Sequence, residues 1–310
     1  MTQGAPSQNR CRPLRDDEDV RRVRDLLVET HSISPPGFNW EVRRWDGWRF
    51  YNPTAEWDPA WESRVQLWET SEGRLVGVVN PEGSGDAHLQ VHPHYRHSIE
   101  EDMLAWAEEH LARQAAVGRR QLTIGVFEYD RPRRELLEER GYEKLDTGGT
   151  FYLLRFGLQL MPEVRLADGY RLRATRPGSA DDAQRIADLL NAAFRRDFHN
   201  AEEYLVFAEN ARCFRHDLDL VAEAPDGSFA SYVGMPYDEQ NRYAIFEPVC
   251  THPDHLRRGL AQALMWEALR RVQALGAVSA STETGQATAA NRLYESIGFT
   301  ETYAMSDWRR

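Results

Sequence analysis

A short basic loop, RRGLA at Arg257–Ala261, combines residue types that can bind an anion. It follows a β-like run and leads into an apolar periodicity typical of a helix, so we expect a strand-to-helix turn. The first turn of a helix offers unpaired N–H groups and the positive end of the helix dipole, which together attract phosphate. Gly259 and Ala261 leave this backbone bare, while Arg257 and Arg258 add positive charge. The loop indicates a phosphate site, although simple turn chemistry would also explain the glycine.

The stretch around this loop occurs twice in the chain. HPDHLRRGLAQALM, His252–Met265, aligns with HPHYRHSIEEDML, His92–Leu104. Two further pairs occur in the same order along the chain: upstream, Leu67–Val79 with Val221–Val233, and downstream, Leu136–Glu143 with Leu293–Thr300. An offset of about 160 residues is the size of a domain and not of a solenoid repeat, so the pattern predicts a duplicated domain.

The length of 310 residues suits two such domains. We expect the joint within Gly157–Tyr170, which gives domains at residues 1–160 and 165–310. Each half reads as strand, helix, strand pair, long strand, helix, strand, helix and strand. This order is typical of an α/β or α+β domain with one mixed sheet. Pro248 lies in the long strand of the second half and predicts a kink or bulge there.

This order of elements, together with RRGLA and with NRLYESIGF at Asn291–Phe299, resembles the GCN5-related N-acetyltransferase (GNAT) family. The resemblance covers essentially all of residues 165–310 and implies two tandem GNAT domains. It implies that the loop cradles the pyrophosphate of acetyl-CoA and that the preceding strand pairs with the pantetheine arm. The implied cofactor-binding residues are Val249, Cys250 and Thr251 on the strand, Arg257, Arg258, Gly259, Leu260 and Ala261 in the loop, and Asn291 on the last helix. Two positions depart from the family, since Leu256 replaces an Arg or Gln and no Asn stands near Ala287.

The resemblance also supplies catalytic candidates. The family places a tyrosine near the CoA sulfur as general acid, and Tyr294 holds that position. A phenol suits the task because its pKa of about 10 is close to that of a thiol, although Tyr294 could simply pack on its helix face. Glu247, just before the expected acetyl position, is the best candidate base, with Glu223 as runner-up and a surface ion pair as an equal alternative. Cys250 is interpreted as a buried strand residue, because no His at suitable spacing suggests an acyl-enzyme.

The first half lacks the residues that carry this chemistry. It has Ile99, Glu101 and Leu137 where the second half has the glycine, the alanine and the tyrosine. We expect the β-branched side chain to fill the phosphate space and the acidic residues Glu100, Glu101 and Asp102 to repel an anion. The first half is therefore expected to be a degenerate, non-catalytic GNAT-like domain.

The composition limits the partners. A net charge of −11 argues against nucleic acid or an anionic membrane. The chain has no run of about 18 apolar residues and no CxxC pair, so neither a membrane span nor a metal site is expected. The Trp-rich segment Asn39–Trp61 is expected mainly to pack, and it could also line a substrate pocket or lid or form the interface between the halves. We expect a cytoplasmic protein, either a monomer with an internal pseudo-dimer or a homodimer.

The resemblance thus implies an N-acetyltransferase, and no metal is expected. It would move an acetyl group from acetyl-CoA to an amine of a small-molecule or peptide acceptor, by direct attack in a ternary complex. Two alternatives stay open: an acetyltransferase of the antibiotic-resistance type, and a non-enzymatic acyl-CoA-binding or regulatory protein.

Overall fold

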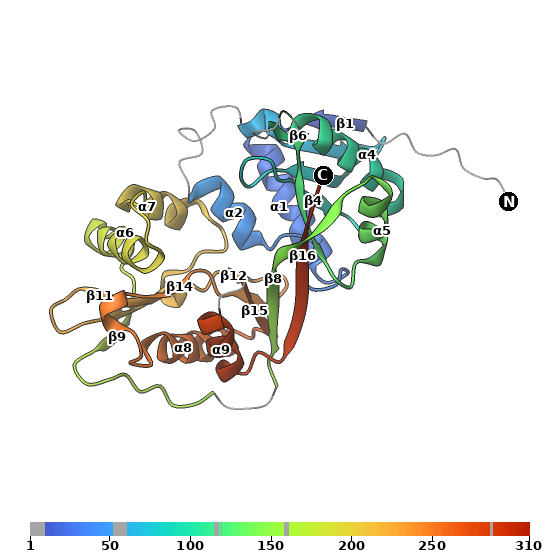
Figure 1. Ribbon diagram of the computed structural model, residues 1–310. Helices are drawn as coiled ribbons and strands as arrows, with labels where there is room; N and C mark the ends of the chain where they lie inside the picture. The colour runs from blue at the N-terminus through green and yellow to red at the C-terminus, as the bar shows by residue number, and fades with distance from the viewer. Residues whose placement is uncertain (1–9, 52–60, 115–117, 119, 158–160, 286–287) are drawn as a thin grey trace. The chain divides into compact units, whose positions relative to one another are not determined.

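The computed structural model describes residues 10–51, 61–114, 118, 120–157, 161–285 and 288–310. The chain forms two compact units (Figure 1). The N-terminal unit consists of Met1–Glu41, Thr54–Thr150 and Tyr303–Arg310, and the C-terminal unit consists of Val42–Pro53 and Phe151–Thr302. Each unit therefore includes a segment that a continuous division of the sequence would assign to the other.

The N-terminal unit contains a four-stranded antiparallel sheet in the order β1-β2-β3-β4. Its elements are β1 (Arg10–Pro13), α1 (Asp17–His31), a 3-10 turn (Trp61–Arg64), β2 (Gln66–Glu69), β3 (Leu75–Asn80), β4 (His88–Val91), α4 (Arg96–His110), β5 (Arg113–Gln114), β6 (Arg120–Gln121), β7 (Thr123–Phe127), α5 (Arg131–Glu139) and the first part of β8 (Glu143–Arg155). The last strand of the chain, β16 (Glu301–Arg309), pairs through Met305–Arg309 with β7. Trp308 on this strand is buried in the core of the unit.

The C-terminal unit contains a second four-stranded sheet in the order β14-β11-β10-β9, together with the strand series β12-β13-β15. Its elements are α2 (Val42–Phe50), β9 (Arg171–Ala174), α6 (Ala180–Phe194), α7 (Ala201–Asn210), β10 (Leu220–Glu223), β11 (Phe229–Val233), β12 (Tyr237–Asp238), β13 (Tyr243–Ile245), β14 (Val249–Thr251), α8 (Leu260–Ala274), β15 (Ser279–Thr284) and α9 (Thr288–Ile297). Helices α6 and α7 lie on one side of the four-stranded sheet, and α8 and α9 lie on the other (Figure 1).

Local sequence explains where these helices start and which face they bury. Ser179 caps α6 by accepting a hydrogen bond from the Asp182 N–H, which satisfies one of the free donors of the first turn. Ile186, Leu189 and Leu190 recur at helical spacing and are buried against the sheet. Gly276, in the left-handed region at φ 87°, follows the end of α8.

The two units repeat one architecture, as the sequence predicts. In the first strand pair, Arg10 lies opposite Glu69, and in the corresponding pair Arg171 lies opposite Glu223. The same buried-acid network follows in both units. Arg12 pairs with Asp19 at 2.6 Å and with Glu69 at 2.8 Å, while its counterpart pairs in the same way, Arg173 with Asp182 and with Glu223, both at 2.8 Å. None of the described helices is both long enough and apolar enough to cross a membrane.

Candidate active site

The predicted central strand of the C-terminal unit divides at Glu247 and Pro248. Before this point β13 runs parallel to β15, and a backbone hydrogen bond joins Phe246 N–H to the Ser281 carbonyl at 2.8 Å. After it, β14 joins the other sheet as an edge strand beside β11. The kink predicted from Pro248 is therefore the point where the chain leaves β15. Among the described strands, β14 pairs with β11 on one side, and its outer edge can bind another partner.

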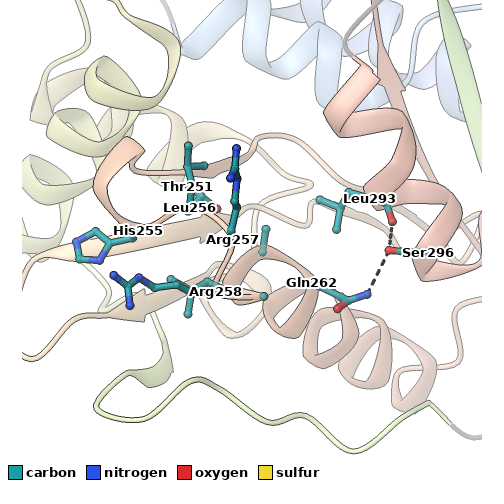
Figure 2. A pocket seen from close by; sticks show the side chains of 11 residues that line it. Thr251, His255, Leu256, Arg257, Arg258, Gln262, Leu293 and Ser296 are labelled. Carbon is teal, nitrogen blue, oxygen red and sulfur yellow. Dashed lines mark hydrogen bonds between the residues drawn. The ribbon is translucent and has the colours of Figure 1, made fainter.

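A pocket of about 240 Å³ begins at the end of β14. Its wall continues through the loop and the first turn of α8 to α9, as Figure 2 shows. The lining residues are Thr251, His255, Leu256, Arg257, Arg258, Gly259, Leu260, Ala261, Gln262, Leu293 and Ser296. All five predicted loop residues and one of the three predicted strand residues thus line the same pocket.

Gly259 gives this pocket an open backbone. It is the residue before α8, has φ 70°, and has no heavy atom within 4 Å of the position where a Cβ would stand. The first intrahelical bond runs from Ala263 N–H to the Gly259 carbonyl, so the preceding N–H groups of α8 have no helical acceptor. Arg257 and Arg258 bring two exposed cations to the same turn. This arrangement suits a diphosphate.

The side of the pocket near His255 is aromatic and basic. The Tyr170 hydroxyl lies 2.8 Å from His255 Nδ1, and the Arg258 guanidinium lies 6.0 Å from the centre of the Tyr170 ring. Leu256, where the family usually has a polar side chain, is 56% exposed. Leu256 therefore places an apolar side chain in the pocket wall. The nearby cations are the two arginines that follow it, Arg257 and Arg258.

Tyr294 lies deeper, on the buried face of α9. It is 6% exposed, and its ring packs 5.5 Å from Tyr152 and 6.0 Å from Phe299, measured between centroids. Burial raises the pKa of Tyr294, and a hydrogen bond with Thr282 partly opposes this rise. Thr282 Oγ1 in turn donates to the Phe246 carbonyl at 3.3 Å, next to Glu247. Tyr294 thus packs in the core and also connects, through Thr282, to the point where β13 ends.

The two carboxylate candidates lie in different surroundings. The Glu247 side chain is 48% exposed and has Arg43 Nη2 3.9 Å from its Oε1. Glu223 instead accepts from Arg173 at 2.8 Å and from Arg171 at 3.2 Å, in the network that recurs in the N-terminal unit. Because this network is shared by both units, it has a structural origin, and Glu223 has the weaker claim to act as a base.

The remaining strand candidates face in two directions. Cys250 is buried on the side of α6, and burial raises the pKa of its thiol to about 12. A thiol with that pKa stays protonated and is a poor nucleophile, in keeping with a packing role. Val249 packs against the opposite core. Sequence reasoning missed Arg43, because nothing in the local pattern places α2 in this unit.

Comparisons with known proteins agree with this geometry. Residues 183–299 match the sequence profile of the acetyltransferase (GNAT) family. The C-terminal half carries a GNAT domain. No curated protein shows significant similarity to the chain.

Two solved structures share the fold of the whole chain at low identity. A tandem GNAT protein from the clavulanic acid biosynthesis pathway is 20% identical with a TM-score of 0.66, over 98% of this chain and 98% of that chain. A GCN5-related N-acetyltransferase from Sphaerobacter thermophilus is 19% identical with a TM-score of 0.61, over 98% of this chain and 96% of that one. The chain therefore has a tandem GNAT fold.

The residues of the GNAT domain fit acetyl-CoA, which this family uses. A Cβ at position 259 would stand in the open pocket, so the bare backbone is free for a phosphate. Asn291 Oδ1 on α9 is buried without a hydrogen-bond partner among the described residues. Thr251 ends the edge strand, and because His252 N–H bonds inward to Ala230, the backbone groups of Thr251 point outward. Within the described ranges, no group of three or more His, Cys, Asp or Glu side chains can hold a metal ion.

The corresponding residues of the N-terminal unit are arranged differently from the expectation. Ile99 does not fill a phosphate space, because its side chain is 1% exposed and packs in the core against Gly77. Helix α4 begins at Arg96, whereas its counterpart α8 begins only after the glycine. The residues that would form the loop are therefore helical. Glu101 and Asp102 are exposed, but Glu100 is buried, where Arg96 and Arg133 hold its carboxylate.

In the N-terminal unit, the side chain of Asn39 forms hydrogen bonds with the edge strand β4. Val91 occupies the register position of Thr251. Its N–H donates to Asn39 Oδ1 at 2.8 Å, and its carbonyl accepts from Asn39 Nδ2 at 3.0 Å. Next to it, Phe38 is buried and has the Arg96 guanidinium 5.2 Å from its ring centre. The edge that the GNAT domain leaves open at Thr251 is thus paired internally here.

Proposed function

We propose that the C-terminal unit transfers an acetyl group from acetyl-CoA to an amine of a small-molecule or peptide acceptor. The observation that carries this proposal is the open, left-handed Gly259 at the start of α8, in a pocket that also includes α9. We further propose that catalysis belongs to the domain at residues 165–310, that the domain at residues 1–160 binds no acetyl-CoA, and that the chain acts in the cytoplasm as a monomer or homodimer.

In this proposal the amine attacks the thioester carbonyl directly. A new C–N bond forms, the C–S bond breaks, and no acyl-enzyme is made, which agrees with the protonated, buried Cys250. Glu247 takes the proton released by the amine, directly or through a water, and its half-exposed carboxylate can accept it. Tyr294 donates its hydroxyl proton to the departing thiolate. Backbone N–H groups of the strand polarise the thioester carbonyl.

The test is a calorimetric titration of the full chain with acetyl-CoA, for the wild type and for Gly259→Glu. We expect one site per chain, and we expect the substitution to weaken binding by about 100-fold or more, because it puts a negative charge in a phosphate cradle. Gly276→Glu is the matched control. That glycine also has a positive φ and open space around it, but it lies at the other end of α8.

Each outcome has a clear meaning. Two sites per chain would show that the N-terminal unit also binds acetyl-CoA. No binding to the wild type would reject the acetyltransferase proposal. Binding without turnover on any amine acceptor would leave the non-enzymatic acyl-CoA-binding alternative.

A further inference from the structure

Helix α2 belongs to the C-terminal unit, although it lies more than 90 residues before the rest of that unit in the sequence. It packs against α7, as Figure 1 shows. Tyr51, which follows the helix, anchors it there. The Tyr51 ring lies 5.2 Å from the Phe207 ring and 6.2 Å from the His199 ring, between centroids. A charged side chain on α2 therefore lies within the C-terminal unit and can interact with its residues.

Arg43 is such a side chain, and its guanidinium is buried. The residue is 6% exposed, and its Cζ lies 4.6 Å from the ring centre of Phe207 and 5.5 Å from that of Tyr51. Gly47, one turn further along α2, provides the space, because a Cβ there would stand 1.8 Å from Arg43 Nη1. Gly47 thus leaves room for the Arg43 guanidinium beside the rings of Phe207 and Tyr51.

A buried guanidinium needs a nearby negative charge, and within the described ranges the carboxylate in ion-pair range of Arg43 is that of Glu247. Arg43 Nη2 lies 3.9 Å from Glu247 Oε1, beyond hydrogen-bond distance. Other well-buried arginines of the described chain have closer partners, such as Arg96 with Asp130 at 2.7 Å. Asp219 also lies in this region, but its carboxylate accepts from Tyr204 and Tyr232, both at 2.7 Å.

The geometry of this pair suits a carboxylate that must remain reactive. A close bidentate pair would occupy both carboxylate oxygens, whereas a charge at 3.9 Å attracts the carboxylate and leaves its oxygens free. Glu247 is also the exposed member, since its side chain is 48% exposed against 7% for Arg43. The guanidinium is thus enclosed, whereas the carboxylate is reached by solvent and so is accessible to an acceptor.

We propose that Arg43 is a positioning residue for the acetyl transfer. It acts through Glu247, whose carboxylate it holds at the end of β13, and does not itself contact the substrates. Gly47 supports it by leaving room for its side chain. This inference rests on the proposed function, because it requires that Glu247 be the base.

The test is a double-mutant cycle in the full chain with Arg43→Gln, Glu247→Gln and the double variant. We expect Arg43→Gln to lower kcat about 10- to 100-fold, with the Kd for acetyl-CoA unchanged. The double variant should be no slower than Glu247→Gln, because both changes remove one function. Arg43→Lys should recover part of kcat, and Arg44→Gln, the same charge change at the next residue of α2, should retain it.

The outcomes separate this inference from the proposed function. If Glu247→Gln lowers kcat but Arg43→Gln does not, or if the two losses simply multiply, Arg43 is no positioning residue and the acetyltransferase proposal stands. If Glu247→Gln leaves kcat unchanged while the wild type turns over, Glu247 is not the base and the inference fails with that assignment. If Arg43→Gln does not fold, Gly47→Ala replaces it, since it displaces the guanidinium and keeps its charge. Unchanged kcat in a folded Gly47→Ala variant would overturn the inference.

Discussion

At the scale of single residues, Tyr294 carries the most direct prediction. Its hydroxyl is buried and its pKa is raised above the ordinary tyrosine value, because burial disfavours the charged phenolate. It therefore stays protonated through neutral and mildly alkaline pH, as a proton donor must. We expect Tyr294→Phe to lower kcat by about 100-fold or more and to leave the Kd for acetyl-CoA unchanged, since the hydroxyl does not line the loop pocket.

Steady-state kinetics and calorimetry on the same preparation would check this. Tyr152→Phe is the control, because it removes a hydroxyl from the neighbouring ring and keeps the aromatic packing. If Tyr294→Phe retained wild-type kcat over the whole pH range, Tyr294 would be a core residue only and another proton donor would be needed.

The residues that the sequence predicted are those whose signals are local. A glycine before a helix is recognisable from the local pattern, and the resemblance of NRLYESIGF to the GNAT family implied Tyr294. The structure places Gly259 in a pocket and Tyr294 in the adjoining core. Arg43 and Asn39 gave no such signal, because their roles depend on contacts with Glu247 and Val91 that are distant in sequence. Long-range placement of this kind follows from tertiary packing, which no local pattern specifies.

At the scale of elements, the difference between α4 and α8 predicts that one glycine will not restore the first site. In the N-terminal unit the helix extends back to Arg96, and Asn39 covers the strand edge at Val91. We expect Ile99→Gly combined with Glu101→Ala to leave the stoichiometry at one acetyl-CoA per chain. We also expect a loss of stability of about 3–5 kcal/mol, because Ile99 is fully buried.

Calorimetric titration and urea unfolding would measure both effects. Glu101→Ala alone serves as the control, because its side chain is exposed and should change stability by no more than about 0.5 kcal/mol. A second acetyl-CoA site in the double variant would show that Ile99 and Glu101 prevent binding in the N-terminal unit, and that the hydrogen bonds of Asn39 to the strand edge do not.

For the molecule as a whole, the two units depend on each other's part of the sequence, because each contains a segment from the other half of the chain. The last strand completes the core of the N-terminal unit, where Met305–Arg309 pair with Phe127–Thr123 and Trp308 is 4% exposed. Helix α2, from the first part of the chain, supplies Arg43 to the GNAT domain. A cut between the two sequence halves would remove a needed segment from each unit.

Trp308 gives this conclusion a measurable consequence. We expect Trp308→Ala to destabilise the N-terminal unit by about 3–5 kcal/mol, because it empties a large buried volume, although the residue is third from the end of the chain. Urea unfolding followed by amide hydrogen exchange would locate the loss in β7 and α4, which share that core. Arg310→Ala is the matched control, since its 54% exposed side chain forms an ion pair with Glu108 and its removal should cost under about 1 kcal/mol. Equal stability of the two variants would mean that β16 does not contribute to the stability of the N-terminal unit.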